Sequence, residues 1–319
     1  MNRSKNNPII TRDQIPSIPP HLVDVSSVFN PGAVRYDGKI LLMLRVQNRA
    51  RETYLLMAES KDGVRFYIRD EPVRFDGIES LTGPVYHIYD PRITQIDERF
   101  YVMFAIDMEG TCELGLALTF DFETFTFIQV VSSGDVRNGV LFPHQIGGRY
   151  LRLDRPNRVK TGGGPATGDR IMLSESNDLL EWRTVAPVIS GRWHYWDEVI
   201  GPGPPPIKTR AGWLQIYHGV AHHLGTGLYQ AGVMLLDLDH PYKVLARGRY
   251  NILEPRELYE LTGQVPNVVF PSGAVVAARD AEGYALPESR VFVYYGAADT
   301  SICLATTTID ELVAHARAT

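Results

Sequence analysis

The sequence has little cysteine and no apolar run long enough to cross a membrane. Only Cys112 and Cys303 occur among its 319 residues. A secreted domain held together by disulfides carries more cysteine, so the reducing cytoplasm is the expected location. No stretch reaches the roughly 18 apolar residues that a transmembrane helix requires, and residues 1–20 lack the apolar segment of a signal peptide. We therefore expect a cytoplasmic protein with no membrane partner.

Clusters of positive charge are also absent. The chain has 32 Lys and Arg against 37 Asp and Glu, which gives a formal net charge of −5. Nucleic acids and acidic membranes are bound through basic clusters, so neither partner is expected. His218, His222 and His223 fall on a predicted strand and the loop after it, without the helical spacing of zinc motifs. We therefore expect no metal site and no cofactor.

Amphipathic helices are almost missing as well. The one good candidate is the C-terminal segment from Ile309 to about Ala318. Elsewhere, short apolar and β-branched runs alternate with Asp-Gly and Gly-Gly turn signals. This pattern predicts antiparallel strands joined by tight turns.

The predicted strands recur in five similar units. Each unit has a short strand, a tight polar turn and a more apolar second strand, as in GAVRYDGKILLMLRV, followed by two further strands. A proline lies near the start of each first strand, at spacings of 60, 52, 62 and 66 residues: Pro31, Pro91, Pro143, Pro205 and Pro271. Five such repeats predict a single all-β domain over residues 1–319, a five-bladed β-propeller with a short C-terminal helix. A pair of β-sandwiches is the alternative.

Polar side chains fall where the repeat would bring them together. In each blade the first and second strands are antiparallel, so the start of one and the end of the other meet at the same end of the channel. The polar residues near these positions are Asn30, Asp90, Arg137, Asn138, Arg45, Arg155, His218, Asp197, Glu198 and Asp299. Any one of them alone could simply bond loop carbonyls. Cations held together cost free energy unless an anion offsets them, so the cluster predicts an anion-binding site.

Several motifs carry a family resemblance. They are YDPR (89–92), RNGVLFP (137–143), GWLQIYHGV (212–220) and YYGAAD (294–299). In this order, and over nearly the whole chain from about Asn7 to Ile309, they resemble the mannoside phosphorylases of glycoside hydrolase family 130. Members of that family are five-bladed propellers, which agrees with the number of repeats.

The resemblance implies a role for each matching residue. Asp90 corresponds to the catalytic acid of the family. Arg137, Arg155 and His218 correspond to its phosphate-binding groups. The groups that the resemblance and the predicted mouth assign to the sugar are Asn30, Arg45, Arg51, Tyr89, Asn138 and Asp299.

One acid with an anion site suits phosphorolysis. An inverting hydrolase needs a second carboxylate to activate water, whereas phosphate is already nucleophilic and needs only positioning and charge neutralisation. The resemblance implies that the acid passes its proton through the 3-hydroxyl of the sugar while phosphate attacks the anomeric carbon. The expected partners are thus a β-mannoside oligosaccharide and inorganic phosphate, and the expected products are α-mannose 1-phosphate and a shortened sugar.

Alternatives stay open at this point. A β-mannoside hydrolase could use Glu198 or Asp197 as base on the same propeller, and a non-catalytic propeller could bind sugar at the same mouth. Acceptor sites are built by loops, so the sequence leaves open both the linkage (β-1,2, β-1,3 or β-1,4) and the acceptor. Propellers of this type commonly self-associate, so a homo-oligomer of unspecified size is expected.

Overall fold

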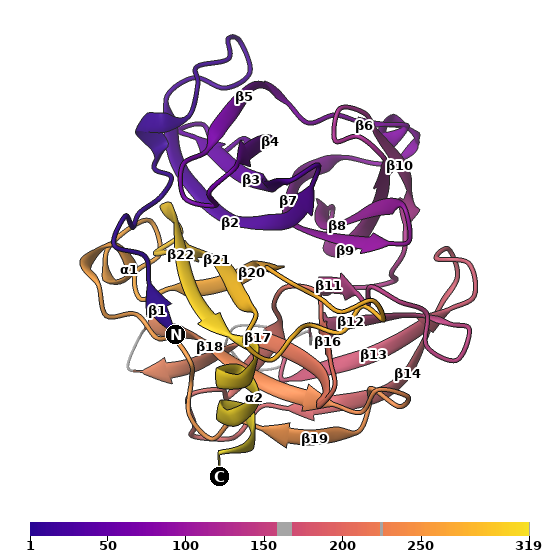
Figure 1. The fold of residues 1–319 in the computed structure, drawn as a ribbon. Coiled ribbons are helices and arrows are strands. Elements are labelled where there is room, and N and C mark those ends of the chain that lie inside the picture. Colours follow the sequence, from indigo (N-terminus) through magenta and orange to yellow (C-terminus); the bar gives the residue numbers. More distant parts are fainter. Residues whose placement is uncertain (158–167, 224–225, 319) are drawn as a thin grey trace.

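The computed structural model describes residues 1–157, 168–223 and 226–318. It forms five antiparallel sheets arranged as the blades of a propeller (Figure 1). The five-bladed all-β fold predicted from the repeats is therefore confirmed. The first strands of successive blades lie beside one another around the centre, where they line the channel.

The first three blades follow the chain in order. Blade 1 consists of β2 (Val25–Tyr36), β3 (Lys39–Asn48), β4 (Thr53–Ser60) and β5 (Tyr67–Pro72). Blade 2 consists of β7 (Val85–Ile96), β8 (Arg99–Met108), β9 (Thr111–Thr119) and β10 (Phe125–Val130), with β6 (Phe75–Asp76) on its outer edge. Blade 3 consists of β11 (Val136–Leu141), β12 (Tyr150–Pro156), β13 (Arg170–Ser176) and β14 (Trp182–Ser190).

The last two blades show how the ring closes. Blade 4 consists of β15 (Val199–Pro202), β16 (Ile207–Thr209), β17 (Gly212–His223), β18 (Thr226–Leu236) and β19 (Val244–Arg247). Blade 5 takes β20 (Val269–Val276), β21 (Arg290–Ala297) and β22 (Ser301–Thr308) from the end of the chain and β1 (Asn2–Arg3) from its beginning. In Figure 1 the indigo β1 lies beside the yellow β22.

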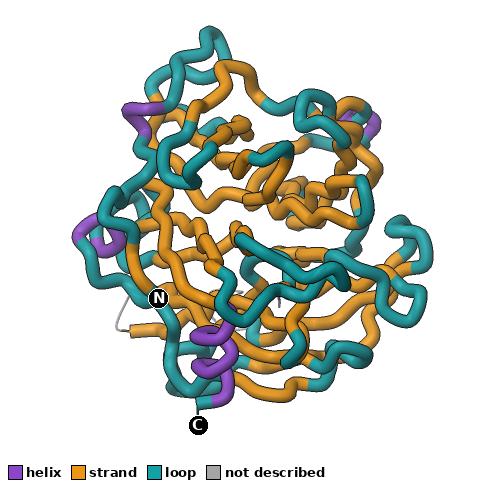
Figure 2. The backbone as a smooth tube through the Cα atoms, in the orientation of Figure 1, coloured by secondary structure: helices purple, strands orange, loops and turns teal. Residues whose placement is uncertain are grey.

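In the part of the chain that the structure describes, helices are confined to a few short segments (Figure 2). They are the 3₁₀ turns η1 (Arg12–Gln14) and η2 (Ile78–Ser80) and the α-helices α1 (Leu258–Leu261) and α2 (Ile309–Arg317). The predicted C-terminal helix is α2, which begins at the capping residue Thr308, whose side chain accepts a hydrogen bond from the Glu311 backbone. Among the described residues, no helix combines the length and the apolar character needed to span a membrane.

Apolar side chains fill the space between neighbouring blades. Between blades 1 and 2, the rings of Phe75 and Phe104 stack with their centroids 4.4 Å apart, and Phe122 packs in the same cluster. The central strands are buried on both faces, which explains why residues 40–46 read as an almost unbroken apolar run. These clusters supply most of the driving force for folding, because burial of apolar surface is its dominant favourable term.

Three of the five prolines of the repeat lie inside first strands and not at their starts, whereas Pro143 and Pro205 follow β11 and β15, so the predicted strand starts are wrong. Pro31 and Pro91 stand within β2 and β7, at points where the pairing register shifts by a β-bulge. Pro271 stands at a similar shift in β20. A bulge leaves a residue outside the hydrogen-bond ladder, and proline, which has no N–H to donate, loses nothing there.

An ion pair with a fully buried carboxylate holds β1, the strand that completes blade 5, in place. The guanidinium of Arg3 in β1 donates from Nε and Nη2 to the two carboxylate oxygens of Glu260, both at 2.8 Å. Glu260 is fully buried in α1 and also accepts the hydroxyl of Tyr295 at 2.8 Å. Arg3 therefore ties the first strand of the chain to its C-terminal third.

We expect Arg3→Met to lower the free energy of unfolding by about 3 kcal/mol, because it leaves the Glu260 carboxylate buried without its cation. Chemical denaturation of the purified protein measures this change. Arg49→Met is the matched control, since Arg49 forms an ion pair with Asp24 on the open surface and should change stability by less than about 0.5 kcal/mol. Equal effects of the two substitutions would contradict the assignment.

Candidate active site

The bulges of the first strands place polar side chains at the centre of the ring. In β7 the register shifts between Tyr89 and Arg92, and in β11 it shifts between Arg137 and Val140. Asp90 and Asn138, within these two bulges, have φ values of 54° and 56°. Aspartate and asparagine are the residues other than glycine that best tolerate this left-handed region.

Asp90 faces a guanidinium that is held between two aromatic rings. Nη1 of Arg45 lies 2.9 Å from Oδ1 of Asp90, and the side chains are 20% and 13% exposed, so a ligand can reach them. The guanidinium carbon lies 4.2 Å from the ring centroid of Phe29 and 4.5 Å from that of Tyr89. The Tyr89 hydroxyl in turn donates to Asp107 at 2.7 Å. Stacking and hydrogen bonding thus fix the orientation of Arg45 toward the acid.

Arg155 and His218 form the base of a cationic pocket. Nη1 of Arg155 lies 3.4 Å from Nε2 of His218, and both side chains are buried. Burial, together with the positive charges of Arg155 and Arg92, holds the pKa of His218 well below its usual value. The imidazole is therefore neutral at neutral pH and can offer one N–H to a ligand.

Arg137 completes this pocket from the side. Its Nε lies 3.6 Å from Asp135, and its side chain is 38% exposed. The charges of Arg137 and Asp90 both act on Arg155, which places the three groups in one electrostatic neighbourhood. The two phosphate-binding arginines expected from the sequence and the expected acid are thus brought together.

Several buried polar atoms of this site have no hydrogen-bond partner among the described residues. They are Asn30 Nδ2, Arg45 Nε, Arg137 Nε, Asn138 Oδ1 and Arg155 Nε. Buried polar groups in folded proteins are nearly always paired, and an unpaired one costs free energy. Their concentration in residues of the predicted site supports a polar ligand there.

Asp299 lies in the turn after β21 with a φ of 50°. Burial raises the pKa of its carboxyl group to about 6, Arg45 opposes this shift, and Asp90 adds to it. Asp299 is therefore close to both Asp90 and Arg45. Asn30 packs against the neighbouring strand, since a Cβ on Gly296 would lie only 2.8 Å from its backbone nitrogen.

One expectation of placement needs correction. His218 lies near the middle of β17 and not at its end, because β17 continues for five residues beyond it. Arg51 lies in the exposed turn after β3, where its Nη1 donates to Oε1 of Gln47 at 3.2 Å. No hydrogen bond or ion pair joins Arg51 to Asp90 within the described part of the chain. The expected role of Arg51 in binding the sugar stays a prediction.

Two residues of the site were not assigned from the sequence. Tyr229 in β18 has its pKa raised by burial, and the charges of Arg155, Asp299 and Asp90 also act on it, so its ring faces the site. Nothing in the sequence indicates that a tyrosine in this later strand of its blade would face the site. Arg92 is almost fully buried beside Asp90; a charged residue directly between the buried positions Pro91 and Ile93 was a signal that could have identified it.

Comparisons with known proteins identify the family of this chain. The sequence model of one family, described as beta-1,4-mannooligosaccharide phosphorylase, matches residues 2–317. This chain belongs to glycoside hydrolase family 130. A beta-1,4-mannooligosaccharide phosphorylase of Ruminococcus albus is 35% identical over 98% of this chain and 89% of its own length.

Other members of family 130 carry different substrate names. A 1,2-beta-oligomannan phosphorylase of a Thermoanaerobacter species is 32% identical over 88% of this chain and 89% of its own length. The solved structure of a beta-1,2-mannobiose phosphorylase from Listeria innocua, in complex with beta-1,2-mannobiose, superposes with a TM-score of 0.84. It is 28% identical and covers 99% of this chain and 98% of its own.

Asp197, a possible base in the hydrolase alternative, is engaged elsewhere in this member of family 130. It is fully buried, and Arg192, Arg247 and Tyr217 donate to its carboxylate at 2.6–2.8 Å. Its oxygen atoms therefore hold the loop before β15 in place and have no surface from which to activate a water. Glu198 is half-buried and makes no hydrogen bond or ion pair with the described residues.

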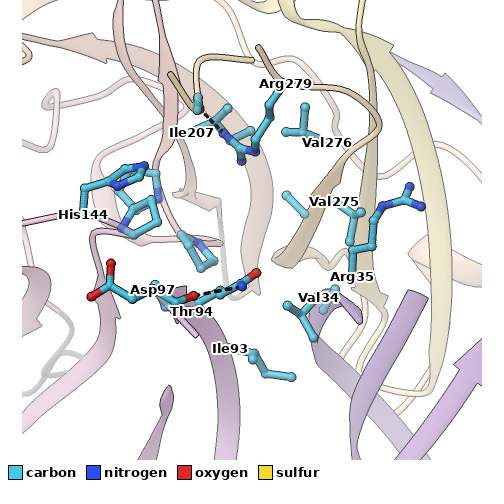
Figure 3. A pocket seen from close by; sticks show the side chains of 17 residues that line it. Val34, Arg35, Ile93, Thr94, Asp97, His144, Ile207, Val275, Val276 and Arg279 are labelled. Atoms are coloured by element: carbon cyan, nitrogen blue, oxygen red, sulfur yellow. Dashed lines mark hydrogen bonds between the residues drawn. The ribbon is translucent and has the colours of Figure 1, made fainter. Parts of the chain in front are cut away.

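The opposite end of the channel has a separate cavity of about 340 Å³ (Figure 3). It is lined by residues that follow the bulges in their strands, among them Val34, Ile93 and Val275. Figure 3 shows Arg279 and His144 on different sides of it. None of the predicted site residues lines this cavity, so it is distinct from the family 130 site.

Gly201 leaves the space in which His218 and Asn138 meet. A Cβ at this position would lie 2.4 Å from Cε1 of His218 and 2.9 Å from Oδ1 of Asn138. We expect Gly201→Ala to displace both side chains and to lower turnover by about tenfold or more in a steady-state assay. Gly248→Ala, where the nearest atom would be 3.2 Å away, is the control and should keep normal turnover. Similar turnover in the two variants would show that this close fit is unimportant.

The raised pKa of Asp299 predicts a pH-dependent stability. An acid with a higher pKa in the folded than in the unfolded protein adds stability below its unfolded value, and this contribution is lost as pH rises through its folded value. Wild type should therefore lose about 1 kcal/mol relative to Asp299→Asn between about pH 5 and pH 7, around the folded value of about 6. Urea denaturation across this range measures the difference in stability. The same pH dependence of stability in both proteins would refute the raised pKa of Asp299.

Proposed function

We propose that this chain is an inverting β-mannoside phosphorylase. It cleaves a β-mannosidic bond with inorganic phosphate and yields α-mannose 1-phosphate and a shortened sugar, in a reversible reaction. The observation that carries the proposal is the composition of the site: one accessible acid, Asp90, opposite Arg137, Arg155 and a neutral His218. Membership of family 130 and the names of the relatives support the same reaction.

In this proposal Asp90 is the general acid. Its proton passes through the 3-hydroxyl of the mannosyl unit to the glycosidic oxygen, and the bond from that oxygen to the anomeric carbon breaks. An oxygen of phosphate forms the new bond on the opposite face of the sugar, which inverts the configuration. Arg45 orients the acid through its 2.9 Å contact, and Asn30, Tyr89, Asn138 and Asp299 surround the sugar.

The cationic pocket serves the phosphate. Arg155 and Arg137 offer planar sets of N–H donors that match phosphate oxygens. His218 adds a neutral N–H donor. A phosphate dianion would therefore satisfy the unpaired Nε atoms of both arginines.

For the linkage we propose β-1,4. The family description and the Ruminococcus albus relative at 35% identity both carry this linkage in their names, whereas the β-1,2 relatives are 32% identical or less. We also propose that the enzyme works in the cytoplasm as a homo-oligomer. The two cysteines, both free thiols, are compatible with a reducing compartment.

The deciding experiment is incubation with β-1,4-mannobiose, with β-1,2-mannobiose as a second substrate, in the presence and absence of phosphate. Phosphate-dependent release of mannose 1-phosphate, faster with the β-1,4 substrate, is the expected result. Release of free mannose without phosphate would establish the hydrolase alternative, with Glu198 as the candidate base. Binding of either sugar with no turnover would establish a non-catalytic propeller.

We expect Asp90→Asn to lower turnover by about 10³-fold, because the amide cannot donate the proton that the leaving oxygen needs. The melting temperature should stay close to that of the wild type. Asp37→Asn is the matched control, since Asp37 lies in the exposed turn between β2 and β3 and should leave turnover unchanged. Near-normal turnover by Asp90→Asn would mean that another group is the acid.

A further inference from the structure

Arg92 is a buried cation without a carboxylate partner among the described residues. Its side chain is 1% exposed, and it donates only to backbone carbonyl oxygens. Nε donates to Gly203 at 2.9 Å, Nη2 to Pro202 at 3.3 Å and Nη1 to Asp90 at 3.1 Å. These three bonds use three of its five N–H donors and do not neutralise its charge.

This arrangement lowers the stability of the fold. A buried charge costs several kcal/mol unless it is paired, and most buried arginines have an acidic partner. Arg152 of this chain is an example, since it is equally buried but lies 2.9 Å from Asp154. Burial lowers the pKa of Arg92 to about 10, although the nearby charge of Asp90, which forms no ion pair with it, opposes this shift, so the guanidinium stays protonated at neutral pH. An apolar residue at position 92 would avoid this cost of burying a charge. The presence of arginine there therefore indicates a functional role.

The position of Arg92 suggests that role. Pro202 and Gly203 follow Gly201 directly, and Gly201 is the residue that contacts His218 and Asn138. Arg92 therefore links the backbone of the acid in blade 2 to the strand of blade 4 that borders the cationic pocket. Its charge also acts on Arg155 and His218, which places the guanidinium close to both of these groups.

We propose that Arg92 is a positioning residue for phosphorolysis, which holds the Asp90 bulge at a fixed distance from the phosphate pocket and adds positive charge close to the bound phosphate. This inference rests on the proposed function and extends it to a residue that does not touch the substrate. Arg92 makes two separate contributions to the reaction. Hydrogen bonds to three carbonyls fix the geometry of the acid, and the charge raises the affinity for phosphate.

The test compares Arg92→Lys with Arg92→Met in the full-length protein. Lysine keeps the charge but cannot reach three carbonyls, so kcat should fall about tenfold or more while the KM for phosphate stays within about threefold. Methionine removes both contributions, so kcat should fall and the KM for phosphate should also rise about tenfold. Calorimetric titration with inorganic phosphate measures the same affinity without turnover.

Arg152→Met is the matched control. It removes another buried arginine, one that bonds Asp154 and the carbonyl of Val131 outside the site, so it should lower the melting temperature and leave both kinetic constants within about twofold. If the Arg92 variants resemble this control, Arg92 has only a structural role. An equal rise in the KM for phosphate in both Arg92 variants would refute the contribution of charge. Failure of both to fold would assign Arg92 to folding alone and overturn the proposal.

The wild-type enzyme distinguishes this inference from the proposed function. If it binds phosphate in the calorimeter but shows no phosphate-dependent turnover, the proposed function fails, and weaker binding by Arg92→Met alone would still support the contribution of charge. If the wild type binds no phosphate, both proposals fail. Phosphate-dependent turnover by the wild type with unchanged constants in folded Arg92 variants would overturn only the inference about Arg92.

Discussion

The β-bulges in the first strands of the blades are the constraint on which the rest of the site depends. Regular strands alternate their side chains between two faces, and in this fold both faces pack against neighbouring blades. A bulge breaks this alternation and turns a side chain out of the sheet. Asp90, Asn30 and Asn138 all lie within such bulges. Without them the same residues would be forced into the apolar layers between blades.

The site and the rest of the fold follow opposite principles. Between the blades, apolar and aromatic side chains fill the space and stabilise the ring. At the centre, arginines and carboxylates lie close together, one carboxyl group has a raised pKa, and several polar atoms are unpaired among the described residues. This arrangement costs stability in the free protein and prepares the site for an anion and a polyhydroxylated ligand. The inter-blade clusters offset that cost.

The sequence was sufficient to predict the architecture and part of the site. Turn signals and alternating runs identified the strands, and the five repeats predicted the five blades, because both depend on local patterns. The motifs around Asp90, Arg137 and His218 identified residues that the fold brings together. The hydrogen-bond partners were beyond reach, because they depend on contacts between segments far apart in the sequence. Asp197 illustrates the difference, since Arg247, which occupies its carboxylate, comes from β19, the outer strand of its blade. The roles of the site residues in catalysis stay predictions.

The closure of the ring through β1 and β22 has a consequence for how the enzyme is made. During translation, the first strand leaves the ribosome about 300 residues before its pairing partner, as the register of Asn2 with Thr306 requires. Blade 5 therefore cannot be completed before β22 has been synthesised, and Asp299 reaches the site only with this last blade. A nascent chain can build the early blades well before its active centre is assembled.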